Sequence, residues 1–253
     1  MLTPRVVKLG GHELDRPGWL AGCARALARL DRVVVVHGGG EAVSALSHRL
    51  GLPVQKRDGR RVTSLEVAEV VELVMAGPVN RQVVAALRAA GLDAVGLSGV
   101  DGGLLTALPG PAELGHVGEI AEVRVALLES FLLAGLTPVI APVAPGEGTG
   151  QPFNVNADDA AAAIAGALHA AELLLVSDVP GVQVQGELRP SLEVDEIETL
   201  IELGVAVDGM AAKLRAARVA LRGGAHAVRI GDARLLEDPR AGTRILASAV
   251  QPA

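Results

Sequence analysis

The stretch RVVKLGG at residues 5–11 decides the fold class, because a short apolar run leads directly into a pair of glycines. The same arrangement returns at residues 33–40, VVVVHGGG, where a second apolar run ends in three glycines. Short apolar runs without polar alternation are typical of strands that are buried on both faces of a parallel sheet. Both segments therefore predict an inner strand that ends in a glycine-rich turn.

Further strand-like runs lie outward from this pair, at 93–98, 137–143, 172–177 and 227–230. Helical patterns separate them, at 19–30, 41–50, 64–76, 79–90, 125–134, 158–168, 195–203 and 209–222. Alternating strands and helices predict an α/β protein with right-handed crossovers. We expect a three-layer αβα sandwich with a mainly parallel central sheet.

Two glycine-containing stretches, 54–62 and 184–188, are predicted to be β-hairpins inserted into this pattern. The Pro/Gly-rich segment 141–152 is the best candidate for a boundary between lobes. We therefore expect one domain over 1–253, with an N-lobe at 1–152 and a C-lobe at 153–253.

Composition excludes several classes of protein. The chain has 23 basic and 29 acidic residues, for a net charge of −6, which argues against a nucleic-acid partner. One tryptophan and two phenylalanines leave little for base stacking. A single cysteine excludes a disulfide framework, and the sequence predicts no metal-ligand cluster. The sequence shows no secretion signal and no apolar run long enough to span a membrane. We therefore expect a cytoplasmic protein without a membrane partner.

Lysine is rare: only Lys8, Lys56 and Lys213 occur, and the other basic residues are arginines. A compact ammonium and a planar guanidinium are not interchangeable at a tight anionic site. Lys8 ends the first strand. Lys213 is expected in the first turn of the helix over 209–222, where a cation is unfavourable unless it faces an anion.

The two glycine-rich turns predict an anion site. Glycines at the end of a buried strand let backbone N–H groups approach an anion, and the N-terminus of the following helix adds favourable charge. Turns on neighbouring strands face one crevice. The alternative is a pair of tight turns that bind nothing.

The string NVNADDAA at 154–161 places Asn154, Asn156, Asp158 and Asp159 at the entry of an alanine-rich helix. Asparagine and aspartate are common helix caps. One cap does not need four such residues, so this string is a second candidate for the site.

Taken together, these motifs resemble the acetylglutamate kinases of the amino-acid kinase superfamily over nearly the whole chain. One departure is Glu41, where many relatives carry proline. The matching strings are KLGG (8–11), HGGG (37–40), LPVQKRDGRRVT (52–63), AVGLSGVDGG (94–103), ELGHVG (113–118), NVNADDAA (154–161), SDVPGV (177–182), DGMAAK (208–213) and GTRILA (242–247).

The resemblance implies phosphoryl transfer from ATP to the γ-carboxylate of N-acetyl-L-glutamate. The product is N-acetyl-L-glutamyl 5-phosphate, in the second step of arginine biosynthesis. Mg²⁺ would be held mainly by the nucleotide phosphates. A carboxylate of pKa about 4.3 is ionised at neutral pH, so no general base is needed. Positioning and charge neutralisation must supply the catalysis.

The resemblance also assigns roles to residues. Lys8 and Lys213 would flank the transferring phosphoryl group, with Asp158 between them as the third catalytic residue. Substrate binding falls to Gly39, Gly40, Asn154 and Arg61, the last gripping the α-carboxylate. Lys56, Arg57 and Arg60 are expected to be solvated. The ATP-binding residues would be Gly10, Gly11, Asp178, Val179, Pro180, Gly181, Val182, Gln183, Val205, Ala206 and Val207.

Two other functions stay open at this point. One is a kinase for a carrier-protein-linked aminoadipate or glutamate in lysine biosynthesis, which would dock a protein through the basic hairpin. The other is a non-catalytic nucleotide-binding regulator. Arginine-inhibited relatives carry an additional helix before the first strand, whereas seven residues precede Lys8 here, so we expect a homodimer.

Overall fold

The computed structural model describes residues 3–57 and 59–247. Within this range the central sheet has eight strands, in the spatial order β14 (Ser191–Glu193), β16 (Thr243–Leu246), β15 (Val228–Gly231), β11 (Glu172–Val176), β1 (Arg5–Leu9), β2 (Val33–His37), β8 (Thr137–Ala141) and β5 (Ala94–Ser98). Neighbouring strands are parallel except β15 and β16, which run antiparallel. The predicted, mainly parallel sheet is confirmed.

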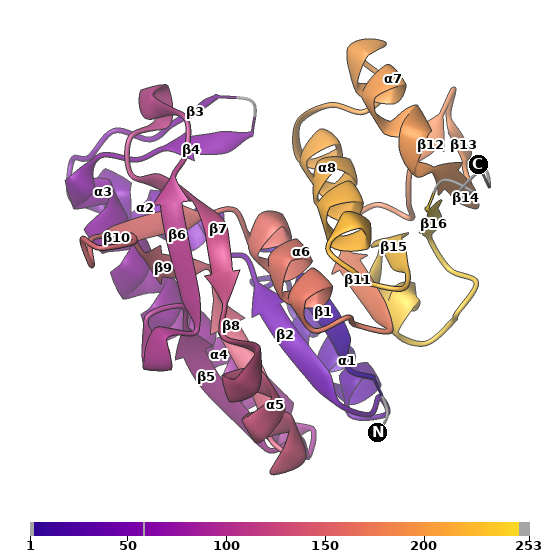
Figure 1. Cartoon of the computed structure of the whole chain (residues 1–253), viewed down its shortest axis with the longest axis horizontal. Coiled ribbons are helices and arrows are strands. Elements are labelled where there is room, and N and C mark those ends of the chain that lie inside the picture. The colour runs from indigo at the N-terminus through magenta and orange to yellow at the C-terminus, as the bar shows by residue number, and fades with distance from the viewer. Residues whose placement is uncertain (1–2, 58, 248–253) are drawn as a thin grey trace.

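Helices cover both faces of this sheet (Figure 1). Successive residues of a strand point to opposite faces. Val6 of β1 accordingly joins one apolar core and Val7 joins the other. The first core is shared with α5 (Val125–Leu133), α6 (Ala157–Ala167), α7 (Ile197–Glu202) and α8 (Asp208–Arg222). The second is shared with α1 (Trp19–Leu27), α2 (Gly40–Arg49), α3 (Leu65–Val74) and α4 (Asn80–Ala89). The three layers of the predicted sandwich are therefore present.

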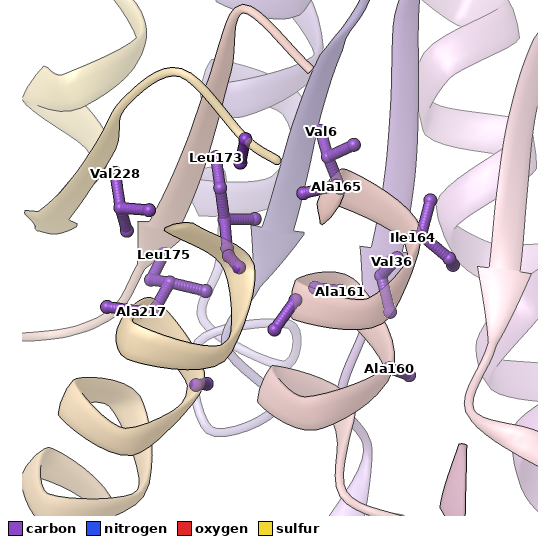
Figure 2. Close-up of a cluster of buried hydrophobic side chains, with 14 of the residues drawn as sticks. Val6, Val36, Ala160, Ala161, Ile164, Ala165, Leu173, Leu175, Ala217 and Val228 are labelled. Carbon is purple, nitrogen blue, oxygen red and sulfur yellow. The ribbon is translucent and has the colours of Figure 1, made fainter. Parts of the chain in front are cut away.

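Small residues bring α6 and α8 close together over the sheet. Figure 2 shows alanines on both helices, with Ala161 on the side of α6 toward α8 and Ala217 on α8. Gly166 and Gly223 meet where the helices pack, because a Cβ on Gly166 would lie 3.0 Å from the Cα of Gly223. This close packing fixes the distance between the two helices that carry Asp158 and Lys213.

A second sheet, which the sequence did not predict, lies beside the first. Its strands follow the order β6 (Leu105–Pro109), β7 (Val117–Val123), β10 (Pro152–Val155) and β9 (Val143–Pro145). They are short, they contain prolines, and β7 is half-exposed, so they lack the apolar runs of the central strands. The expected lobe boundary at 152/153 falls inside β10 and stays a prediction.

Both predicted hairpins are confirmed. The first is β3 (Gln55–Arg57) with β4 (Arg60–Val62), and the second is β12 (Gln183–Val184) with β13 (Glu187–Leu188). The β3–β4 hairpin projects beyond the second sheet on the side of α8 (Figure 1). It carries Arg61, which the sequence predicts to be a substrate-binding residue.

Helices α3 and α4 are joined by a π-helical turn, Met75–Val79, in which Gly77 leaves the helical conformation. The whole stretch Leu65–Ala89 is long and apolar enough to cross a membrane by length and composition. However, 44% of its most apolar window is buried, and Val67, Val83 and Leu87 belong to the second core. A core helix meets the same criterion, so this stretch is weak evidence for a membrane span.

Candidate active site

A pocket of about 270 Å³ lies where β1 and β2 end. Its wall includes the turns that follow these strands, the β3–β4 hairpin, the start of α6 and the first half of α8. Ligands of open α/β sheets bind outside the carboxyl ends of the strands, which is where this pocket lies. The predicted site residues that line it are Lys8, Gly11, Gly39, Gly40, Arg61, Asn154, Asp158 and Lys213.

Lys8, Asp158 and Lys213 meet in the wall of the pocket, and we call them the phosphoryl cluster after the role predicted for them. Oδ1 of Asp158 lies 2.9 Å from Nζ of Lys8, and Oδ2 lies 3.4 Å from Nζ of Lys213. The three side chains are almost buried, with exposed fractions of 8%, 6% and 11% in that order. Two ammonium groups share one carboxylate, so the cluster keeps one excess positive charge if all three are ionised.

The pKa shifts of the cluster reflect this balance. Burial by itself would raise the pKa of Asp158, but the charges of Lys8 and Lys213 outweigh burial and lower it. Burial lowers the pKa of Lys213, and the nearby charge of Lys8 lowers it further, while Asp158 opposes both effects. Asp158 is therefore held as a carboxylate between two cations, which is how it can orient both.

Lys213 lies one turn later than the sequence analysis expected. It is the sixth residue of α8 and thus belongs to the second turn. The buried carboxylate at the start of α6 offsets its charge, so the position of Lys213 no longer needs the helix-terminus argument. The expected meeting of the two lysines on Asp158 is nevertheless what the geometry shows.

The glycine turns are needed for packing as well as for access. A Cβ on Gly11 would lie 2.5 Å from the backbone nitrogen of Gly39, and one on Gly38 would lie 2.8 Å from that of Gly11. The two turns therefore pass each other backbone against backbone, which only glycine permits. Gly10 lies against Glu13 and Val176 and is not part of the pocket wall.

His37 holds the second glycine turn, residues 38–40, through its hydrogen bonds. Its Nδ1 lies 2.9 Å from the carbonyl oxygen of Gly38, and its Nε2 lies 3.1 Å from the side-chain nitrogen of Asn80. The Asn80 amide also donates to the carbonyl oxygen of Val139. Burial lowers the pKa of His37 to about 4, so the ring is neutral, with Nδ1 donating and Nε2 accepting. His37 is fully buried, and its role is to hold the turn.

Arg61 also lines the pocket. Its Nη2 donates to the carbonyl oxygen of Gly40 and to Oγ of Ser44, each at 2.7 Å. Its Nη1 is buried and has no hydrogen-bond partner in the protein. Burial lowers the pKa of the Arg61 guanidinium from its ordinarily high value. A buried cationic donor without a partner is suited to bind an anion that enters the pocket.

The two asparagines of the NVNAD string have different roles. The side-chain nitrogen of Asn154 donates to Oγ1 of Thr63 at 3.1 Å, and Asn154 lines the pocket. Asn156 instead caps α6, because its Oδ1 accepts from the backbone N–H groups of Asp158 and Asp159. The cap therefore holds the backbone of Asp158, and Asn154 remains available to a ligand.

Two contacts at the pocket were not found from the sequence. Nδ1 of His12 contacts the carboxylate of Glu41, so the residue that departs from the family pattern joins the first turn to the second. Arg60 was expected to be solvated, but it is half-buried and bound to Asp159. Both pairs join residues far apart in sequence, and no local pattern signals them.

The residues expected to bind ATP lie in two other segments. Asp178–Gln183 follows β11, and Val205–Val207 precedes α8. Val182 and Ala206 are buried, while Asp178, Val205 and Val207 are exposed. None of these residues lines the pocket. Asp178 is close enough to act on the charge of Lys213, but the nucleotide-binding role of both segments stays a prediction.

The chain is similar to known proteins over almost its whole length. Residues 3–232 match the model of the amino acid kinase family. An acetylglutamate kinase of Chloroflexus aurantiacus is 48% identical over 96% of this chain and 97% of its own length. That of Chloroflexus aggregans is 45% identical, over 97% and 98%. A solved N-acetylglutamate synthase of Neisseria gonorrhoeae, complexed with coenzyme A and N-acetyl-glutamate, is 26% identical with a TM-score of 0.84, covering 98% of this chain and 60% of that one.

The chain belongs to the amino acid kinase family, and it is a kinase. Its similarity to acetylglutamate kinases extends over almost the whole length of both proteins. This similarity favours the predicted acetylglutamate kinase activity over the carrier-linked kinase and over the non-catalytic regulator.

Proposed function

We propose that this protein transfers the γ-phosphoryl group of ATP to the γ-carboxylate of N-acetyl-L-glutamate, in the second step of arginine biosynthesis. The observation that supports this most is the charge of the pocket lining. The pocket is lined both by the buried cluster with excess positive charge and by Arg61, which has a buried donor without a partner in the protein. A dicarboxylic acid anchored on Arg61 would present its second carboxylate to the cluster.

The step balances without a proton. A γ-carboxylate oxygen attacks the γ-phosphorus, and the bond from that phosphorus to the β–γ bridging oxygen breaks, leaving ADP with the electron pair. Lys8 and Lys213 offset the charge of the phosphoryl oxygens, and Asp158 keeps both ammonium groups in place. Asn154, Gly39 and Gly40 orient the substrate beside them.

ATP and Mg²⁺ enter as substrate and its counter-ion. Among the described residues, no group of three or more His, Cys, Asp or Glu is placed to hold a metal ion. Mg²⁺ usually binds through substrate phosphates and water with few protein carboxylates, which supports a metal carried by the nucleotide. The segments Asp178–Gln183 and Val205–Val207 would hold the nucleotide.

Trapping the acyl phosphate with hydroxylamine tests this function. With ATP, Mg²⁺ and N-acetyl-L-glutamate we expect a hydroxamate to accumulate, and with L-glutamate, which lacks the acetyl group, we expect much less. The Asp158→Asn variant is the matched protein control. Turnover of a carrier-linked amino acid without turnover of N-acetyl-L-glutamate would contradict the proposal, and so would ATP binding without any hydroxamate.

The quaternary state and location belong to the same proposal: a cytoplasmic homodimer. Large leucines remain exposed on the outer helices, with exposed fractions of 58% at Leu50 and 64% at Leu73. We propose that the interface between two copies buries these side chains, since contiguous exposed apolar patches mark interaction sites. Light scattering on the purified protein is expected to give twice the mass of the 25.8 kDa chain. A monomer mass across the concentration range would contradict this part.

A further inference from the structure

Helix α6 begins with two adjacent aspartates, and the proposed chemistry uses only Asp158. The second, Asp159, faces the β3–β4 hairpin. Nη2 of Arg60 donates to its Oδ2 at 3.0 Å, and the two side chains retain 31% and 30% of their exposure. Arg60 also lies 3.6 Å from Glu119 of β7, whose side chain is 60% exposed. The shorter and more buried contact therefore joins the hairpin to α6.

Each partner lies one residue from the proposed machinery. Arg60 precedes Arg61, which carries the free Nη1, and Asp159 follows Asp158, which holds the two lysines. The hairpin also reaches α8, because a Cβ on Gly59 would lie 3.6 Å from the carbonyl carbon of Asp208. The hairpin is thus in contact with both helices that carry the phosphoryl cluster.

We infer that the Arg60–Asp159 ion pair is a positioning contact of the kinase reaction: it holds Arg61 at a fixed distance from the phosphoryl cluster. The inference rests on the proposed function. When the pair is broken, the hairpin keeps its own strand pairing but loses its side-chain tie to α6. Arg61 then spends less time where it can hold the acidic substrate, whereas Lys8, Asp158 and Lys213 stay in place.

The surroundings of Asp159 make this contact sensitive to pH. Burial raises the pKa of Asp159 to about 6; the charges of Asp158 and Glu119 also raise it, and Arg60 lowers it. The ion pair is complete only when Asp159 is ionised, above about pH 6, and it weakens as the pH falls through that value. The charged groups that face Asp159 or share its adjoining cavity of about 390 Å³ are Arg57, Arg60, Glu113, Asp158, Glu119 and Arg215.

The test is the substrate KM of the Asp159→Asn variant. At pH 7.5 we expect KM for N-acetyl-L-glutamate to rise about three- to five-fold, as for a half-exposed ion pair, with kcat within two-fold of wild type. The wild-type KM is expected to rise toward the variant's value as the pH falls below about 6. The KM of the variant is expected to lack this change with pH.

Arg60→Gln and the double variant separate the pair from its parts. If Arg60 and Asp159 act through each other, the double variant has a KM no higher than the worse single variant. Asp93→Asn is the matched control, because it removes another Arg–Asp pair, Arg88–Asp93 at 2.6 Å, between α4 and β5. Its KM is expected to equal that of wild type.

Trypsin gives a readout that does not need activity, because Lys56 and Arg57 are exposed on the hairpin. At pH 7.5 we expect cleavage after these residues to be about three-fold faster in Asp159→Asn and unchanged in Asp93→Asn. An unchanged KM in an active enzyme would overturn the positioning role, whatever the cleavage rate. Equal cleavage rates would overturn the structural tie, even if wild type makes no hydroxamate and the proposed function itself fails.

Discussion

The phosphoryl cluster and the β3–β4 hairpin line the same pocket but are held in different ways. Lys8, Asp158 and Lys213 project from β1, α6 and α8, which are packed into the first apolar core. Arg61 projects from a two-stranded hairpin whose first strand is exposed along its whole length. The cluster is positioned by the core, whereas the hairpin is positioned by a few polar contacts.

We expect this difference to separate phosphoryl transfer from substrate binding. Phosphoryl transfer needs groups preorganised to within a fraction of an ångström, which a close-packed core supplies. Substrate entry and release need an element that can move at low cost, and exposed segments with few apolar contacts are the ones that open locally. We therefore expect changes in the cluster to alter kcat and changes in the hairpin to alter KM.

The largest effect is expected from Lys213→Ala. Removing one preorganised donor typically lowers kcat by about 10²–10³-fold, and KM for N-acetyl-L-glutamate should change little because Arg61 is untouched. Steady-state kinetics measure both parameters. The matched control is Arg222→Ala, which removes an exposed cation from the last turn of the same helix. Unchanged turnover in Lys213→Ala would refute the assigned role.

Arg61→Ala tests the β3–β4 hairpin. A hydrogen bond to a charged group contributes about 1.5–3 kcal/mol, so KM should rise roughly 10- to 100-fold with a smaller change in kcat. Ser44→Ala is the comparison variant, since it removes one hydrogen-bond partner of Nη2 but keeps the guanidinium, so a smaller rise in KM is expected. A loss of kcat in Arg61→Ala at unchanged KM would mean that the division between hairpin and cluster is wrong.

The smallest effect in this series concerns His37, which holds the turn between the two regions. The unfolded chain binds a proton at His37 below about pH 6.5, and the folded chain does so only near pH 4. The contribution of His37 to stability is thus complete above pH 6.5 and falls as the pH drops toward 4. At pH 5.5 the loss is roughly 1–2 kcal/mol. Urea unfolding from pH 7 to pH 5 measures it.

His37→Gln should flatten this part of the stability profile, since glutamine does not titrate, even if the variant is less stable throughout. His48→Gln, which replaces an exposed histidine of α2, should leave the profile as in wild type. If His37→Gln keeps the wild-type slope between pH 5 and 7, the buried neutral imidazole is not its source.

Much of the fold could be predicted because its signals are local. The strands at 5–9 and 33–37 and the turns at Gly91 and Gly135, which have positive φ, follow from runs of side chains and single glycines. Ser64 caps α3 by accepting from the N–H of Val67. The second sheet was not predicted because its strands mix apolar residues with proline, glycine and charged residues, and two of them have only three or four residues.

The candidate site, too, could be predicted only where the signal is local. The motifs with lysine, aspartate and glycine indicated which residues take part, since charge and the lack of a Cβ are properties of the residue itself. Arg60 was misread because a half-buried arginine and a solvated one have the same local sequence. Its partner Asp159 lies on another element and becomes its neighbour only when the chain folds.

The sequence by itself determined the order of six strands of the central sheet and of the helices between them, the glycine turns, and the family to which the chain belongs, because these depend on local period and residue type. Only the tertiary structure decided that Asp158 lies between two lysines and that Arg61 keeps one donor free. Those distances depend on how α6 packs against α8 through Gly166 and Gly223, and on how the hairpin is tied to both helices. Packing of this kind depends on contacts between residues that are far apart in the sequence, so no local sequence pattern predicts it.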